Sequence, residues 1–305
     1  MKTVLITGSN GLLGQKLTDL YLQKKNKKLI ATGLGPNRHP EKNGYIYETL
    51  DIKDKSNLIS IIDKYKPDCI IHTAAMTQVD DCETNKVECD SLNVGAVENI
   101  ASVAAEYNIH LVHLSTDFIF DGTKELLSEE ETPNPLSYYG LSKLKGEQII
   151  QKTCKSFAIL RTVLVYGVVA DMSRSNIVLW AVNSLKAGKN IKVVNDQWRT
   201  PTLAEDLAQG CYLAEDKNAV GIFNISGPDY VSMDQMVLTI ADIWNLDTSL
   251  IQTISSIELN QAAKRPPKTG FNINKAIKDL QYSPHNLEDG LKLVKSQIEV
   301  NNTPK

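Results

Sequence analysis

The sequence predicts an α/β protein built on a doubly wound parallel sheet, with a smaller C-terminal domain. Three observations predict it: apolar strands alternate with helical stretches, a glycine-rich turn follows the first strand, and the alternation loosens in the second half. The chain has 305 residues, enough for about two domains. With 42% hydrophobic and 23% charged residues, it has the composition of a globular chain with a sizeable core.

The first half consists of strands and helices in turn. "TVLIT" at residues 3–7 is a run of β-formers, and Leu13, Leu17 and Leu20 follow at helical spacing, which predicts a helix over 12–23. Continuously apolar strands such as "CII" fit a sheet covered on both faces. The other predicted strands are 29–33, 45–50, 68–74, 110–116 and 157–162, and the other helices are 56–65, 87–107 and 137–150.

Beyond residue 162 strands and helices no longer alternate regularly. Helices are predicted near 175–187, 203–214, 233–244 and 287–298, separated by stretches such as "NDQWRTPT" and "NISGPDY". We therefore expect one domain over residues 1–162, with segments near 202–225 returning to its sheet, and residues 163–305 to form mainly the second domain.

Bulk properties exclude several classes of protein. A formal net charge of −3 gives no electrostatic reason to expect a nucleic-acid partner. The five cysteines include no Cys-x-x-Cys pair, so neither a disulfide framework nor a metal site is indicated, and the thiols are expected to be reduced and packed. The apolar run before Gly8 is too short for a signal peptide and no stretch approaches a membrane span, which predicts a cytoplasmic protein without a membrane partner.

Three glycines, spaced Gly8-x-x-Gly11-x-x-Gly14, lie at the turn between the first strand and the first helix. Such a turn can hold a pyrophosphate. The first glycine permits a tight bend, the second leaves no Cβ between backbone and phosphate, and the third lets helix and strand approach. The helix N-terminus adds N–H donors and a positive dipole. An ordinary glycine-rich loop is the alternative.

Two further elements carry side chains suited to proton transfer. Tyr139 and Lys143, in "SYYGLSKLKGE", are four residues apart and share one face of the predicted helix. A nearby ammonium would lower the phenol pKa from about 10 and prepare it for acid/base work. Thr116 ends a buried strand, at the sheet edge where ligands bind, and could hold a substrate oxygen. A solvated helix face and a local loop cap are the alternatives.

Together, the glycine turn, Thr116 and the Tyr139/Lys143 pair resemble the extended short-chain dehydrogenase/reductase family over nearly the whole chain. The resemblance implies an NAD(P)-binding Rossmann fold, with a dinucleotide-binding domain followed by a substrate-binding domain. It implies that Tyr139 is the acid/base, that Lys143 binds the nicotinamide ribose and lowers the tyrosine pKa, and that Thr116 hydrogen-bonds the reacting oxygen. The implied cofactor contacts are Gly8, Asn10, Gly11, Leu12, Leu13, Gly14, Arg38, Asp51, Ile52, Ala74, Ala75, Met76, Tyr139 and Lys143.

Within that family the chain resembles the dTDP-4-dehydrorhamnose reductases, through "STDFIFDG", "PNPLSYYGLSKLKGE", "LRTVLVYG", "NDQWRTPT" and "RPPKTGF". Asp117 and Phe118 disfavour a sugar dehydratase, which typically has Asp-Glu after its threonine. One departure is Leu164, where the reductases often have a tryptophan, so a stacking contact to the sugar nucleotide would be lost. The substrate contacts expected from the resemblance and from the mixed aromatic and polar side chains are Thr77, Asp117, Asn176, Gln197, Trp198 and Arg199.

The end of the second strand bears on the choice of cofactor. An acidic residue there would accept hydrogen bonds from the adenosine ribose 2′-OH and favour NAD. "LIATGLGPNRHP" has no acid before Arg38 and His39, so NADP(H) is preferred and NAD(H) is the second option. A solvated loop charge is the alternative for Arg38. His72 and His113 are expected to be packed, hydrogen-bonded residues rather than metal ligands.

The leading functional hypothesis is an NADPH-dependent reductase of a nucleotide-linked 4-keto-6-deoxy sugar, as in dTDP-rhamnose biosynthesis. A second is a nucleotide-sugar epimerase of the same fold, which would retain tightly held NAD(H). A third is a non-catalytic, cofactor-binding regulatory subunit like the β subunit of methionine adenosyltransferase, which has a segment similar to "NDQWRTPT". Retention of Thr116, Tyr139 and Lys143 favours an enzyme. A homodimer is compatible with each hypothesis.

Overall fold

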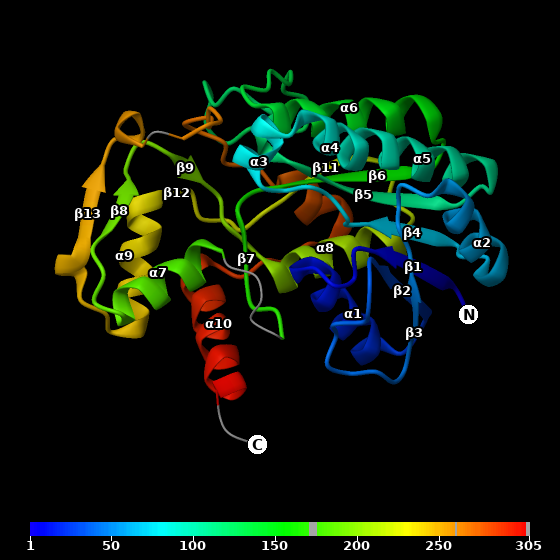
Figure 1. The fold of residues 1–305 in the computed structure, drawn as a ribbon, viewed down its shortest axis with the longest axis horizontal. Coiled ribbons are helices and arrows are strands. Elements are labelled where there is room, and N and C mark those ends of the chain that lie inside the picture. Colours follow the sequence, from blue (N-terminus) through cyan, green and yellow to red (C-terminus); the bar gives the residue numbers. More distant parts are fainter. Residues whose placement is uncertain (171–175, 260, 303–305) are drawn as a thin grey trace.

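A seven-stranded parallel sheet is the largest element of the structure, a computed structural model that describes residues 1–170, 176–259 and 261–302. The strands run in the order β3-β2-β1-β4-β5-β6-β11 (Figure 1). Because the chain first builds outward from β1 to β3 and then continues on the other side of β1, the sheet is doubly wound, and the predicted fold class is confirmed. The strands are β1 (Thr3–Thr7), β2 (Lys28–Gly33), β3 (Ile46–Thr49), β4 (Cys69–His72), β5 (His110–Thr116), β6 (Phe157–Thr162) and β11 (Gly221–Ile225).

Helices cover both faces of this sheet, as the continuously apolar strands predict. One face packs against α1 (Leu12–Lys24) and α8 (Ala204–Asp216), and the other against α2 (Lys55–Tyr65), α5 (Ala96–Glu106) and α6 (Tyr138–Thr153) (Figure 1). Strands β1, β4 and β5 are buried along their whole length. Their carboxyl ends therefore form a rigid edge from which the next loops start.

Segments from the second half complete this sheet. Helix α8 packs on the same face as α1, and β11 pairs with β6, in the region near 202–225 where returning segments were predicted. A later segment also joins this core, with its apolar side chains buried beside those of α1 and α8: Phe271, Ile273, Ala276, Leu280 and Tyr282.

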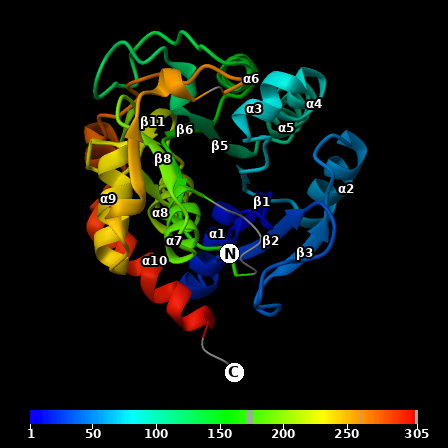
Figure 2. The same cartoon turned by 60° about the vertical axis from the view of Figure 1, so that its left-hand side comes forward.

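A second hydrophobic core lies beyond the sheet (Figure 2). It is built by α7 (Ile177–Lys186), α9 (Met233–Trp244) and α10 (Leu287–Asn302) together with the parallel pair β8 (Ile191–Val194) and β13 (Ile251–Ile254). The predicted helix near 175–187 corresponds to α7, although its first residue, Ser175, lies outside the described residues.

Short strand pairs connect the two cores. They are β7 (Val165–Tyr166) with β10 (Thr202–Leu203), and β9 (Trp198–Arg199) with β12 (Val231–Ser232). Leu164 lies at this junction with a left-handed φ of 39° and packs against both cores. The leucine at the position where the reductases often have a tryptophan therefore packs between the two hydrophobic cores.

The predicted helix over 87–107 is divided into three parts. It begins as α4 (Lys86–Asp90), widens into one π-helical turn at Ser91–Gly95, and continues as α5. A short helix that was not predicted, α3 (Val79–Thr84), precedes it. Such π-turns are frequent at functional sites, and this one carries the buried Asn93.

All five cysteines are buried, which confirms that they are packed, and none is paired with another cysteine in the structure. In the part of the chain that the structure describes, no helix has the length and apolar character needed to span a membrane.

Candidate functional site

The glycine turn has the geometry that its spacing predicts. Gly8 has a left-handed φ of +75°, and a Cβ there would lie 2.8 Å from the Ala74 nitrogen on the neighbouring strand end. A Cβ on Gly14 would lie 2.3 Å from the Gly8 carbonyl oxygen, so only glycine lets α1 start this close to β1. At Gly11 a Cβ would meet only the Gly8 oxygen, at 3.3 Å, which leaves its outer side open. This cradle fits a pyrophosphate.

The loop after β2 is fastened to the glycine turn by Asn10. Its Oδ1 accepts from the Arg38 backbone nitrogen at 2.8 Å, and its Nδ2 donates to the Pro36 carbonyl and the Tyr47 hydroxyl, both at 3.0 Å. The Arg38 side chain itself is exposed. An exposed guanidinium on an anchored loop, with no acidic residue between β2 and Arg38, fits a ribose 2′-phosphate.

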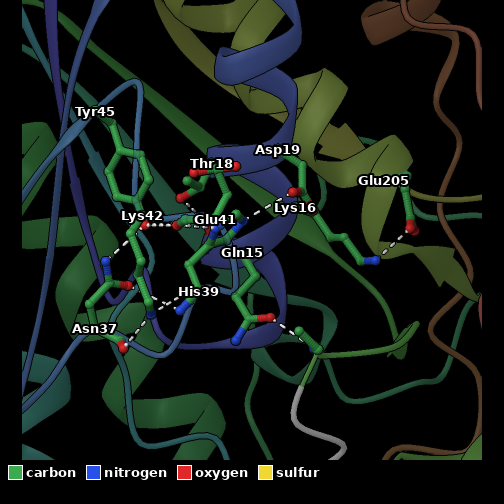
Figure 3. Close-up of polar contacts among 12 residues, drawn as sticks. Gln15, Lys16, Thr18, Asp19, Asn37, His39, Glu41, Lys42, Tyr45 and Glu205 are labelled. Atoms are coloured by element: carbon green, nitrogen blue, oxygen red, sulfur yellow. Dashed lines mark hydrogen bonds and ion pairs between the residues drawn. The ribbon is translucent and has the colours of Figure 1, made fainter. Parts of the chain in front are cut away.

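His39 anchors the same loop to α1 (Figure 3). The ring is buried, with Nε2 3.0 Å from Asp19 Oδ1 and Nδ1 3.0 Å from the Glu41 carbonyl. Burial works to lower the pKa of His39, but these hydrogen bonds outweigh it and the pKa is raised. Figure 3 also shows Lys16, which joins α1 to α8 through a 2.9 Å ion pair with Glu205.

Thr116 and Tyr139 meet at the carboxyl end of β5. A hydrogen bond joins their hydroxyl groups, while the Thr116 hydroxyl also lies 3.0 Å from Asp117 Oδ1 and accepts from the Phe118 nitrogen at 3.2 Å. A Cβ on Gly140 would lie 2.0 Å from the Phe118 oxygen, so this glycine lets α6 approach the strand end. Thr116 is thus a local cap and a neighbour of Tyr139 at once.

Burial controls the protonation of Tyr139. Desolvation raises its pKa, although the Thr116 hydrogen bond acts in the opposite direction. From the sequence, Lys143 was predicted to lower this pKa; the structure differs because burial dominates. Tyr139 therefore stays protonated at neutral pH.

Lys143 lies on the buried face of α6 rather than on a solvated one. Its Nζ lies 3.4 Å from His113 Nε2, and His113 stacks on His72 with ring centroids 5.2 Å apart. Burial lowers the pKa of Lys143 to about 8, against the opposing effect of the Glu147 carboxylate. Both histidines are packed and hydrogen-bonded, as expected for these two properties.

Asn93 is a site residue that the sequence analysis missed. Its Oδ1 accepts from the Met76 nitrogen at 2.9 Å, and its Nδ2 donates to the Met76 carbonyl and to Ser142 Oγ, both at 3.0 Å. Ser142 Oγ in turn donates to the Tyr139 carbonyl at 2.8 Å. One amide thus fixes the loop after β4 relative to α6. The available signal was an asparagine within an apolar helical stretch, "SLNVGAV".

Asp117 and Arg199 form a buried ion pair with Arg199 Nε 3.8 Å from Asp117 Oδ2. Arg199 also donates to the carbonyls of Trp198 (2.8 Å), Pro266 (2.8 Å) and Pro267 (3.1 Å), and Thr269 hydrogen-bonds Asp117. Burial raises the pKa of Asp117 and lowers that of Arg199, and each charge partly offsets the effect on the other. Asp117 and Arg199 were predicted to contact the substrate. In the structure they bind each other, and Arg199 also binds backbone carbonyls of the segments around it.

The other expected residues lie on several different elements. Trp198 is half-buried and packs on Tyr230 with ring centroids 5.4 Å apart. Asn176 caps α7 and donates to the Gly167 carbonyl at 2.7 Å. The remaining residues have these environments: Thr77 is exposed, Gln197 and Ile52 are buried, and Asp51, Leu12, Leu13, Ala74, Ala75 and Met76 are half-buried.

The fold and the arrangement of Gly8, Thr116, Tyr139 and Lys143 define a Rossmann-type protein of the extended short-chain dehydrogenase/reductase class. Comparison with known families gives a more specific result. Residues 1–299 match the family described as RmlD substrate binding domain, and the chain belongs to that family.

Individual relatives fall into two groups. The chain is 31% identical to methionine adenosyltransferase 2 subunit beta of Rattus norvegicus over 279 residues, covering 90% of this chain and 81% of that protein. It is 29% identical to the probable low-salt glycan biosynthesis reductase Agl14 of Haloferax volcanii over 288 residues, covering 94% and 95%.

Two solved structures are similar throughout. A dTDP-4-dehydrorhamnose reductase from Clostridium acetobutylicum superposes with a TM-score of 0.86 at 26% identity, covering 97% of this chain and 99% of that one. The Bacillus anthracis dTDP-4-dehydrorhamnose reductase in complex with NADP gives 0.84 at 27% identity, with 97% and 100% covered.

Proposed function

We propose that this protein is an NADPH-dependent reductase of a nucleotide-linked 4-keto-6-deoxy sugar. The observation that carries the proposal is the hydrogen bond between Thr116 and the hydroxyl of a protonated Tyr139, at the sheet edge where doubly wound folds bind ligands. Family membership and the similarity to two dTDP-4-dehydrorhamnose reductases support a nucleotide sugar as substrate.

The residues that would hold the dinucleotide surround the glycine turn. The turn at 8–14 would bind the pyrophosphate, since a Cβ would fill it and the α1 N-terminus supplies N–H donors. Arg38 would pair with the 2′-phosphate, and Lys143 would hold the nicotinamide ribose. When bound, NADPH supplies the hydride that reduces the sugar carbonyl. The proposed neighbours of the adenine and the cofactor chain are Asn10, Asp51, Ile52, Ala74, Ala75 and Met76.

Residues of the protein supply the proton that the substrate carbonyl oxygen takes up. Tyr139 donates its hydroxyl proton to the carbonyl oxygen as that oxygen gains negative charge. The Thr116 hydroxyl, which donates to Asp117 Oδ1 at 3.0 Å in the structure, would turn this proton to the same oxygen and orient it. A raised Tyr139 pKa suits this direction of reaction, because the acid must be protonated at the start of the cycle. Trp198, with Thr77, Asn176 and Gln197 around the same edge, would contact the nucleotide sugar, while Arg199 and Asp117 support the wall.

A regulatory subunit is the second candidate. The similarity to methionine adenosyltransferase 2 subunit beta, at 31% over 90% of this chain, favours it. Such a protein would keep the dinucleotide cradle and use its surface to bind another protein.

The test is NADPH consumption by the purified protein with a panel of dTDP-linked and UDP-linked 4-keto-6-deoxy sugars. A reductase oxidises NADPH in step with formation of a 4-hydroxy sugar and exchanges the cofactor freely. NAD(H) that is released only on denaturation indicates an epimerase. If NADPH binds but no sugar supports its oxidation, and an enzyme co-purifies with the chain, the regulatory function replaces the proposal.

A further inference from the structure

Three polar side chains form a row across the centre of the sheet. The parallel register pairs Thr7 of β1 with His72 of β4, and His72 with His113 of β5. Registered residues of neighbouring strands point to the same face of a sheet. Accordingly, Thr7 Oγ1 lies 2.7 Å from His72 Nδ1, and the rings of His72 and His113 stack at an interplanar angle of 28°. We call Thr7, His72 and His113 the imidazole row.

The row ends on Lys143. The Lys143 Nζ lies 3.4 Å from His113 Nε2, and the two residues are 4% and 1% exposed, so the contact is shielded from bulk solvent. Among the described residues, His113 is the one hydrogen-bond partner of that ammonium. Gly146, one turn further along α6, has no side chain where a Cβ would lie 3.7 Å from His113 Nε2 and 3.2 Å from the Asn93 oxygen. This glycine allows α6 to lie against β5.

The charge states of the two groups follow from their chemistry. An ammonium has only donors, so His113 Nε2 accepts and the ring carries its proton on Nδ1. Burial keeps the pKa of His113 well below its usual value, and the Lys143 charge lowers it further. Burial also lowers the pKa of His72, to about 3, so the row stays neutral.

Other titratable groups around the ammonium come from three helices. Glu147 lies on α6 itself, with its carboxylate held by Arg161 at 3.0 and 2.8 Å. Cys82 on α3 and Cys89 on α4 are the other two groups whose charge would act on Lys143, besides the two imidazoles. None of the three donates to or accepts from the lysine at hydrogen-bonding distance among the described contacts, which leaves His113 to set its position.

We propose that His113 is a positioning residue, whose neutral imidazole, backed by His72 and Thr7, holds the Lys143 ammonium through Nε2. The hydrogen bond favours the charged lysine and uses one of its three N–H groups, which leaves the other two for a ligand. The importance of this for catalysis rests on the proposed reductase function. The hydrogen bond itself is independent of that function, so it can be tested separately.

The direct test follows the titration of Lys143 by NMR in protein labelled at lysine Cε, with K143M to assign the resonance. H113F removes the acceptor, and we expect the pKa of Lys143 to fall by about one unit, a tenfold change in its dissociation constant. H113Q restores an acceptor oxygen and is expected to recover part of the shift. The control is H110F, which replaces another buried histidine of β5 that is bonded to Ser156 and not to Lys143. An unchanged Lys143 titration in H113F, or an equal change in H110F, would overturn the proposal.

A reciprocal measurement covers the case in which H113F does not fold. In K143M the positive charge beside His113 is absent, and the His113 pKa is expected to rise. An unmoved His113 titration contradicts the contact.

Measurements of reductase activity distinguish the proposed reductase function from the proposed role of His113. If the protein reduces keto sugars, the pH dependence of kcat in H113Q should shift with the Lys143 titration while NADPH affinity changes less. A kcat profile that stays fixed while Lys143 titrates differently would remove His113 from the mechanism and leave the reductase intact. Absence of turnover in the wild type would overturn the reductase proposal and leave the lysine titration as the test of His113.

Discussion

At the residue scale, protonation in the site is set by burial more than by charge pairing. Tyr139 and Lys143 are four residues apart on α6, yet their pKa values move in the directions that desolvation dictates, upward for the phenol and downward for the ammonium. As a consequence, the Tyr139 hydroxyl is protonated at neutral pH and can donate its proton. The lysine, at a pKa of about 8, is close to its own titration.

The most direct residue-scale prediction concerns Tyr139→Phe. It removes the proton donor and the hydrogen bond to Thr116 but keeps the ring, which packs edge-on against Phe118 at 5.8 Å. We expect kcat to fall by at least about 100-fold, since positioned acid catalysis contributes on that order. NADPH affinity, measured by fluorescence titration, should change little. An undiminished rate of NADPH oxidation would remove Tyr139 from the mechanism.

Cofactor choice is tested at Arg38. Arg38→Ser removes an exposed guanidinium whose backbone remains tied to Asn10. We expect the Kd for NADPH to rise about tenfold, equivalent to about 1.4 kcal/mol, with little change for NADH. Lys155→Ser, which removes an exposed charge before β6, is the matched control. Equal weakening of both cofactors would show that Arg38 does not read the phosphate.

At the element scale, the site depends on how loops and helices are fastened at their ends. Gly140 brings α6 against the end of β5, and Asn93 in the π-turn ties the loop after β4 to the same helix. The loop that carries Arg38 is fixed by Asn10 on one side and by His39 on the other. These contacts fix the backbone on which the reactive groups stand.

The His39 anchor predicts a pH-dependent stability. Because the folded pKa of His39 is raised, its contribution is fully present below the ordinary pKa and is lost as pH rises through the folded value. The difference in unfolding free energy between wild type and His39→Gln should therefore be larger at about pH 6 than at about pH 9. Since Asp19 is half-exposed, the pH-dependent part should stay below about 1 kcal/mol.

Urea unfolding at several pH values measures this difference. Asp19→Asn should remove most of the same pH-dependent part, because it takes away the partner of the charged ring. A His39→Gln deficit that is constant over this range would mean that the ring contributes by packing alone.

At the scale of the whole molecule, two cores meet at the site. The sheet contributes Thr116, the covering helix α6 contributes Tyr139, and the second half contributes Arg199 and Trp198 on β9. The Asp117–Arg199 pair crosses this junction, and the carbonyls of Pro266 and Pro267 bind the same guanidinium. The wall of the site is thus held by a buried charge pair from distant parts of the chain.

Arg199→Met tests this junction. It leaves the Asp117 carboxylate buried without its Arg199 counter-charge, and we expect a loss of about 3 kcal/mol in the free energy of unfolding. The double variant with Asp117→Asn should recover part of that loss, since no uncompensated charge remains. Arg265→Met, which removes the partly exposed partner of Asp80, should cost less than about 1 kcal/mol. Similar losses for the two arginines, measured by urea unfolding, would contradict a special role for the buried pair.

Local pattern was enough to predict most elements. The strands 110–116 and 157–162 and the helix 233–244 have the predicted bounds, because each combines an unambiguous period with a clear stop. The π-turn within the predicted helix over 87–107 was not predicted, because one extra residue in a single turn changes the spacing of apolar residues very little. The role of Asn93 could not be predicted from local sequence for a different reason. Its partners lie 17 and 49 residues away in the chain.

The sequence by itself determined the doubly wound fold, the glycine cradle and the candidate group of Thr116, Tyr139 and Lys143, because these depend on periodicity, on backbone freedom and on motif order. Only the tertiary structure decided their electrostatics. It buried Lys143 against His113, raised the Tyr139 pKa and turned Asp117 and Arg199 toward each other. Desolvation and pairing depend on which distant segments cover a group, and no local pattern contains that information.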